Sequence, residues 1–172
     1  MNEILNNMKT RRSIRKYKDE MIPDEIIDQI IEAGTYAASG RNHQASIIIA
    51  VKDQTVRNQL SNLNAQVMGV DSDPLYGAPV VLVVLAKKDW PTHVYDGSLV
   101  MGNLMLAAHS LNVGSCWIHR AKEVFEMDEG KEILKSLGIE DEYEGIGNCI
   151  LGYVDGDMPE AAPRKDNYVY KI

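Results

Sequence analysis

The sequence predicts a fold in which helices pack on both faces of a β-sheet. Segments with helical spacing of apolar residues alternate along the chain with apolar runs of strand length. Residues 80–86 form an unbroken apolar run, which is typical of a central strand covered on both faces. Residues 95–112 fit a helix that is apolar nearly all round, so we expect it in the middle of a domain or at a subunit interface.

The N-terminal third should hold two helices joined by an irregular segment. Residues 3–9 fit a short helix, and residues 10–18 alternate too poorly for more than a loop or a short edge strand. A longer helix is expected over about 23–37, because Pro23 suits a first turn and Asp24 and Glu25 suit the positive end of the helix dipole.

The following elements alternate between strand and helix. Residues 39–44 are polar and form a loop, and the apolar run 47–51 predicts a strand. Apolar residues then recur at helical spacing up to Val67, in a helix that Asp53 can cap. Two glycines and two prolines mark residues 69–79 as a connection.

The C-terminal part should add two strands and one helix. The strands are expected over 115–119 and over 145–154, and a helix over 121–137 with Gly138 as its stop. Residues 155–172 have no periodicity, so we expect a tail that lies across the surface of its own chain or of a partner.

Length and composition bound the class of protein. A chain of 172 residues and 19.2 kDa fits one domain, residues 1–172, and can bury a core without disulfides or structural metal. Its net charge of −7 argues against general binding of nucleic acid. No signal-like leader or membrane-length apolar run is present, so a cytoplasmic location without membrane contact is expected. Cys116 and Cys149 are interpreted as ordinary buried thiols.

A basic run near the N-terminus stands out in this acidic chain. Six of the 18 positive charges fall within ten residues: Lys9, Arg11, Arg12, Arg15, Lys16 and Lys18. Arginine forks match phosphate oxygens in pairs, so the run predicts either an anion site or a solvated face with surface ion pairs. The pair Arg164-Lys165 could contribute only if the tail folds back towards this run.

Other candidate groups carry weaker signals. Ser39, Asn42 and Gln44 could hydrogen-bond the edge of a heterocycle or simply make turns. His119 closes a predicted strand, and its side chain could serve as an acid or a base, bind a phosphate, or be an ordinary surface histidine. The sequence has no metal-ligand spacing, P-loop or dinucleotide fingerprint, so no metal site is expected.

Five segments in order resemble the FMN-dependent nitroreductase family over nearly the whole chain. The segments are Arg11–Tyr17, the loop Ser39–Gln44, the helix Asp96–Ala108, the strand Gly114–Ile118, and Gly152-Tyr153 followed by Pro163-Arg164-Lys165. The resemblance implies an α+β, three-layer α/β/α fold with a mixed, mostly antiparallel sheet, in an intertwined homodimer whose tail packs on the partner. Ala38 and Ala45 stand where the family commonly has proline.

The resemblance also implies the site residues. It assigns the FMN phosphate to Arg11, Ser13, Arg164 and Lys165, and it places Arg12 near the pyrimidine edge or the ribityl chain as electrostatic support, with Arg15 in the same site. The neighbouring subunit would contribute Ser39, Gly40, Asn42 and Gln44. Asn64 would add an amide, and the backbone of Trp117, Ile118 and His119 would face flavin N5 and O4.

The activity implied by the resemblance is electron transfer from NAD(P)H through flavin N5 to a nitroaromatic, a quinone or a similar acceptor, by ping-pong kinetics. No acid or base side chain is required for it, because the cofactor carries the chemistry. The alternatives are a flavin-binding protein with little turnover, a relative that acts on reduced flavin or a halogenated phenol, and, without the resemblance, a domain for another phosphorylated ligand. Only residues 87–93 separate the central strand from the long helix, so the acceptor stays open.

Overall fold

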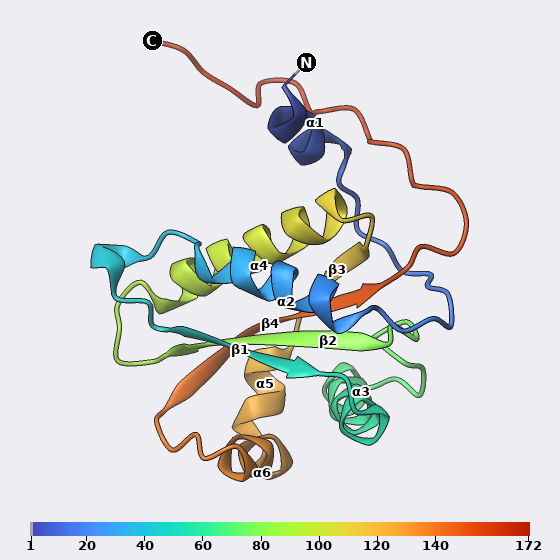
Figure 1. Cartoon of the computed structure of the whole chain (residues 1–172). Coiled ribbons are helices and arrows are strands. Elements are labelled where there is room, and N and C mark those ends of the chain that lie inside the picture. The colour runs from blue at the N-terminus through green and yellow to red at the C-terminus, as the bar shows by residue number, and fades with distance from the viewer. Residues whose placement is uncertain (1) are drawn as a thin grey trace.

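The computed structural model describes residues 2–172, and a four-stranded sheet forms its middle layer (Figure 1). The strands are β1 (Ser46–Val51), β2 (Val80–Lys87), β3 (Gly114–Ile118) and β4 (Tyr143–Gly152). They lie in the order β1-β2-β4-β3, and neighbouring strands pair antiparallel. The sheet is thus antiparallel throughout its four strands, and the one parallel pairing within residues 2–172 is an isolated bridge between Ser13 and Ser115, because the Ser13 segment does not add the further strand that would make the sheet mixed.

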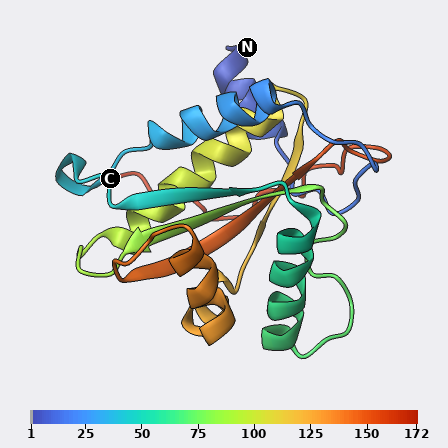
Figure 2. The same ribbon diagram turned by 60° about the horizontal axis from the view of Figure 1, so that its bottom comes forward.

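Helices cover both faces of the sheet, so the predicted three layers are confirmed (Figures 1 and 2). One face carries α2 (Asp24–Thr35) and α4 (His93–Ser110), with α1 (Glu3–Thr10) beyond the end of α4. The other face carries α3 (Gln54–Met68), α5 (Ala121–Glu126) and α6 (Asp128–Ser136). The Asp53 side chain accepts a hydrogen bond from the Val56 amide, which confirms the predicted cap of α3.

Strand β2 lies between the two halves of the core. Every side chain from Val80 to Ala86 is fully buried, as its unbroken apolar run predicts. Val80, Leu82 and Val84 pack in the cluster that includes α2 and α4. The alternate residues Val81, Val83 and Leu85 pack in the cluster on the α3, α5 and α6 side. Because side chains of a strand alternate between its faces, this one strand supplies both clusters.

The single helix predicted over 121–137 is wrong. The chain forms α5 and α6 with a break at Met127, whose backbone is extended at φ −73° and ψ 156°. Helix α6 packs directly against the end of α5 at Gly130, where a Cβ atom would lie 2.1 Å from the Val124 carbonyl oxygen. The break therefore depends on contact between two turns, which apolar spacing along the chain does not reveal. Gly138 does follow the end of α6, with a left-handed φ of 72°.

The two cysteines are buried and free, as expected. Strand pairing sets Trp117 opposite Cys149, so Cys116 and Cys149 project from opposite faces of the sheet and cannot form a disulfide. Burial raises the pKa of Cys149 to about 12. Its thiol is therefore protonated near neutral pH, which is typical of a structural cysteine.

The connection over 69–79 is organised by one carboxylate, that of Asp73. This carboxylate accepts hydrogen bonds from Arg57 Nη2 (2.5 Å), Ser61 Oγ (2.5 Å), Leu75 N (2.9 Å) and Gly77 N (2.7 Å). Burial alone would raise the pKa of Asp73, but the bonds from Arg57 and Ser61 and from the two amides lower it below the ordinary value. The Arg57 side chain is only 6% exposed and also donates to the Ala78 carbonyl.

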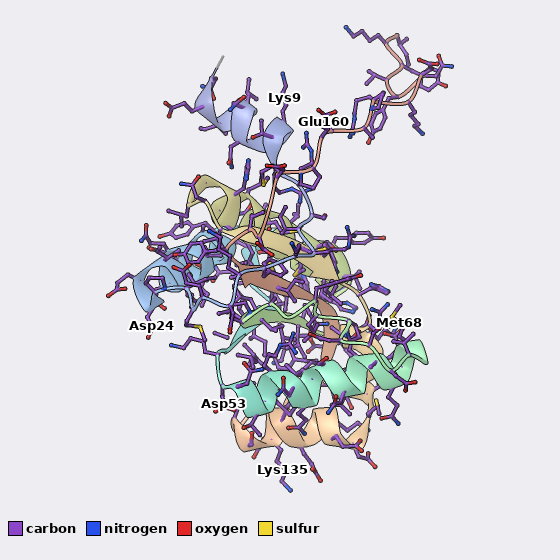
Figure 3. The ribbon with its side chains drawn as sticks, turned by 90° about the vertical axis from the view of Figure 1, so that its right-hand side faces the viewer. Lys9, Asp24, Asp53, Met68, Lys135 and Glu160 are labelled. Carbon is purple, nitrogen blue, oxygen red and sulfur yellow. The ribbon has the colours of Figure 1, made fainter. Side chains whose placement is uncertain are left out.

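The tail leaves the end of β4 and runs outside the body of the chain (Figures 1 and 3). From Gly156 to Ile172 every residue is exposed, including the large apolar side chains Tyr168, Val169 and Tyr170. Across residues 2–172, none of the helices combines the length and the apolar character that a membrane span requires.

Candidate functional site

The basic run divides into an outer part and an inner part. Lys16 forms an exposed ion pair with Asp155 at 2.9 Å. For this residue the structure agrees with a solvated face that carries surface ion pairs. Ile14 is buried and its amide donates to the Ser115 carbonyl at 2.9 Å, so it fixes the segment beside the start of β3. Next to this anchor, Arg11 and Arg12 are half-buried.

Buried donors without partners gather at this inner part. Arg11 Nη1, Arg12 Nε and Ser115 Oγ are buried and have no hydrogen-bond partner within residues 2–172. A pocket of about 230 Å³ opens there, lined by Arg12, Ser115, His109 and others. A buried donor is costly unless it is paired, so these atoms favour an anion site over a solvated face. We call Arg11, Arg12, Ser13 and Ser115 the anion cluster.

His109 lies beside the anion cluster, and no sequence pattern indicates this position. Its Nε2 lies 2.8 Å from Thr10 Oγ1. Burial lowers the pKa of His109, and the positive charges of Arg11 and Arg12 lower it further. The residue stands at the end of α4, ninety-nine positions from Thr10, so only the folded chain brings it to the cluster.

The lowered pKa of His109 predicts a pH effect on the cofactor-free protein. Between that lowered value and about 6.5, the unfolded chain binds a proton that the folded chain does not. Stability should therefore fall as the pH drops through this interval, and His109→Gln should remove that part of the slope. Thermal unfolding of both proteins between about pH 8 and about pH 5 measures the difference.

The same histidine reports on bound anions. Inorganic phosphate in the anion cluster would offset the arginine charges, so the His109 pKa measured by NMR should rise when phosphate is added. A pKa that phosphate leaves unchanged would count against an anion site at this place.

The polar loop lies at the other end of α4. It contains the short 3-10 helix η1 (Gly40–Asn42), and the Gly40 amide donates to Asp96 Oδ1 at 3.0 Å. Gln44 Nε2 donates to Asn42 Oδ1 at 3.0 Å, and both residues have left-handed φ angles, 53° and 55°. Such angles are unfavourable for residues with a side chain, so contacts must hold the loop in this form.

One of these contacts is a stacked aromatic pair. The His43 ring stacks on the Trp90 ring with 3.9 Å between centroids and 15° between planes. Trp90 belongs to the short connection before α4, and no sequence pattern marks it as part of the site. A pocket of about 400 Å³ lies against the loop, lined by Ser39, Gln44, Asp96 and apolar residues of α2, β1 and α4.

The end of β3 forms the third part of the predicted site. The side chain of Asn64 is nearly fully buried and donates to the His119 carbonyl at 3.2 Å. Its Oδ1 accepts from Arg120 Nε at 2.8 Å. Asn148 also donates towards the His119 carbonyl, at 3.4 Å. The amide of Asn64 therefore holds the strand end in place, with its donor and its acceptor both engaged.

Within one chain, the structure does not bring these parts together (Figure 1). Asp96 contacts the loop, and His109 lines the pocket beside the anion cluster. The two residues are thirteen positions apart on α4, about 20 Å along a helix. Arg15 lies elsewhere, 6.0 Å from the centre of the Tyr76 ring. Arg164 and Lys165 are exposed in the tail, and Arg164 donates only to the Ala162 carbonyl.

No group of three or more histidine, cysteine, aspartate or glutamate side chains within residues 2–172 is placed to hold a metal ion.

One named relative matches most of the chain and another matches less than half of it. An Archaeoglobus fulgidus protein with the provisional name NADH dehydrogenase/NAD(P)H nitroreductase is 33% identical over 159 residues, which cover 89% of this chain and 86% of that protein. A Bacillus subtilis FMN reductase [NAD(P)H] is 37% identical over 76 residues, 44% of this chain and 30% of its own length.

Solved structures agree in fold along the full length. A nitroreductase with bound FMN from Bacteroides fragilis superposes with a TM-score of 0.91 at 26% identity, covering 100% of both chains. A second nitroreductase with bound FMN, from Desulfitobacterium hafniense, gives a TM-score of 0.87 at 27% identity, covering 99% of both chains.

The sequence profile described as the Nitroreductase family matches residues 8–74 and 64–153, which together include the anion cluster, the polar loop and the end of β3. The chain therefore belongs to the nitroreductase family.

Proposed function

We propose that this protein is an FMN-dependent oxidoreductase that takes electrons from NAD(P)H and passes them to a nitroaromatic, a quinone or a similar small acceptor. The observation that carries the proposal is the anion cluster, with buried donors of Arg11, Arg12 and Ser115 that have no partner in the described chain. Support comes from the FMN bound in similar structures and from the NAD(P)H named for relatives.

The residues present fit the cofactor. The anion cluster matches a phosphate, since arginine and serine donors are available there without rearrangement. Strand β3 leads from Ser115 to His119, about 13 Å at the usual rise, so a ligand with a phosphate at one end and a flat ring at the other can span it. Bound FMN supplies the hydride and electron chemistry, while the chain binds, orients and shields it. Arg12 contributes a fixed positive charge.

The site requires two chains in this proposal. The polar loop lies about 20 Å from the anion cluster within one chain, so a second chain must supply Ser39, Gly40, Asn42 and Gln44. An exposed apolar surface on α4 is available for pairing: Tyr95 is 72% exposed and Leu99 is 50% exposed. In this proposal the exposed tail packs on the second chain, and this packing brings Arg164 and Lys165 to the phosphate.

Leu99→Glu should therefore break the dimer and lose the flavin, because a charge in an apolar interface is costly. Light scattering should give about 19.2 kDa for the variant and about twice that mass for the parent. Leu137→Glu is the matched control, since Leu137 is 54% exposed and belongs to the opposite face of the sheet. A Leu99→Glu protein that stays dimeric and yellow would contradict the proposed interface.

Colour and bleaching test the activity. The purified protein should be yellow, lose its colour anaerobically with NAD(P)H, and recover it when a nitroaromatic or a quinone is added. Ping-pong kinetics predict parallel double-reciprocal plots when both substrates are varied. Bleaching without recovery by any acceptor would favour a flavin-binding protein with little turnover, and FMN or a halogenated phenol serve as the other test acceptors. A colourless protein that does not take up FMN would refute the proposal.

A further inference from the structure

Arg120 stands at the junction between β3 and α5 in an unusual backbone conformation. Its φ is 71°, in the left-handed region that residues with a side chain seldom occupy, and it is the residue before the first turn of α5. The nitroreductase resemblance assigns it no role. In this conformation the Arg120 side chain contacts a residue of helix α3.

That residue is Asn64 on α3. Arg120 Nε donates to Asn64 Oδ1 at 2.8 Å, and the same amide donates to the His119 carbonyl at 3.2 Å. Asn64 is 1% exposed, and Asn148, which lies 3.4 Å from the same carbonyl, is 3% exposed. Two buried amides therefore hold both the strand end and the base of the guanidinium, which limits the positions that the guanidinium can take.

The outer nitrogens of this guanidinium are unused. Nη1 and Nη2 of Arg120 make no hydrogen bond within residues 2–172, and none of the ion pairs of that part of the chain includes Arg120. In a chain with net charge −7, carboxylates are abundant, yet this cation has none. The guanidinium of Arg120 is therefore held at Nε by Asn64, while its two outer nitrogens stay free at the partly exposed strand end.

We propose that Arg120 is a specificity-determining residue that binds a carboxylate on the electron acceptor. This inference rests on the proposed function, because it takes the end of β3 as the place where the acceptor meets the flavin. A planar guanidinium fork pairs with a carboxylate through two parallel hydrogen bonds. Because Nε is hydrogen-bonded to Asn64, the two outer nitrogens are left for the ligand. The side chain is already partly ordered before binding, which lowers the entropic cost of binding.

The position of the Arg120–Asn64 pair favours the acceptor over NAD(P)H as the molecule whose anionic group binds Arg120. Arg120 follows His119, whose backbone is expected to face the reacting edge of the flavin, so in this proposal the outer nitrogens of Arg120 lie near that edge. A carboxylate on a small aromatic ring is separated from the reacting group by the ring alone. In NAD(P)H the phosphates are separated from the nicotinamide by a ribose, which places them farther from the reacting edge.

The test compares two acceptors that differ by one charge. Protein loaded with FMN is reduced anaerobically with dithionite, added only until the flavin colour is lost, and then mixed with 4-nitrobenzoate or with its methyl ester, so that NAD(P)H takes no part. We expect the rate ratio of acid over ester to fall about tenfold or more in Arg120→Gln, as for a lost bond to a charged group. Arg120→Lys should recover part of the ratio, because it keeps the charge without the fork. Lys135→Gln is the control: it removes the same charge from the exposed helix α6 and should leave the acid-to-ester rate ratio unchanged (Figure 3).

A binding measurement separates this inference from the proposed function. Benzoate cannot accept electrons, and its dissociation constant from the oxidised, flavin-loaded protein should rise about tenfold in Arg120→Gln. Arg120→Gly, which suits the left-handed backbone, should show the same loss and thereby exclude misfolding as the cause. Unchanged benzoate affinity and an unchanged acid-to-ester ratio in FMN-loaded, NAD(P)H-reducible variants would overturn the role of Arg120 alone. A protein that never binds FMN would overturn both proposals.

Discussion

Arg11→Ala should weaken FMN binding about tenfold to a hundredfold, because one charge-assisted hydrogen bond to phosphate contributes about 1.5–3 kcal/mol. Arg11 Nη1 is buried and has no partner in the described chain, so its replacement removes a donor that only a ligand can use. Quenching of flavin fluorescence during titration of the cofactor-free protein gives the two dissociation constants.

The same substitution should not destabilise the cofactor-free protein. The positive charges of Arg11 and Arg12 both act on His109, and Arg11→Ala removes one of these charges without breaking a hydrogen bond of Nη1. Its melting temperature should therefore match or exceed that of the parent. Lys18→Ala is the control for charge, since Lys18 is an exposed member of the same basic run. Equal loss of FMN in both variants would mean that net charge, and not the anion cluster, holds the phosphate.

Asp73→Ala should have the largest effect on stability, about 3 kcal/mol, near the lower end of what the loss of one partner costs a buried ion pair. The lower end applies because the Asp73 side chain is 34% exposed, whereas that of Arg57 is 6% exposed. The variant leaves Arg57 buried without its counter-charge and frees the connection over 69–79. For a chain of this size the melting temperature should fall by about 10 °C.

Two controls isolate the ion pair in this experiment. Asp71→Ala removes an exposed carboxylate from the same connection and should change the melting temperature little. Asp73→Ala combined with Arg57→Met should regain part of the lost stability, because the buried charge is then gone. A double variant no more stable than Asp73→Ala would show that the backbone bonds of Asp73 to Leu75 and Gly77 matter more than the charge.

Sequence patterns determined those features that depend on neighbours along the chain. The unbroken apolar run at 80–86 predicted the central strand, and Asp53 before an apolar repeat predicted the start of α3. The basic run predicted an anion site as one of two alternatives, and five segments in order indicated the nitroreductase family, which the family match confirms. Periodicity and capping act within a few residues, so the sequence shows them directly.

Only the tertiary structure decided which side chains meet. Thr10 and His109 are ninety-nine positions apart, and Asn64 and Arg120 are fifty-six apart, so neither pair leaves a local pattern. The break at Met127 likewise depends on the packing of α6 against α5, and the distance between the polar loop and the anion cluster depends on the direction of α4. Contacts of this kind arise when the core closes around the sheet, because burial selects partners by position in space and not by order in the chain.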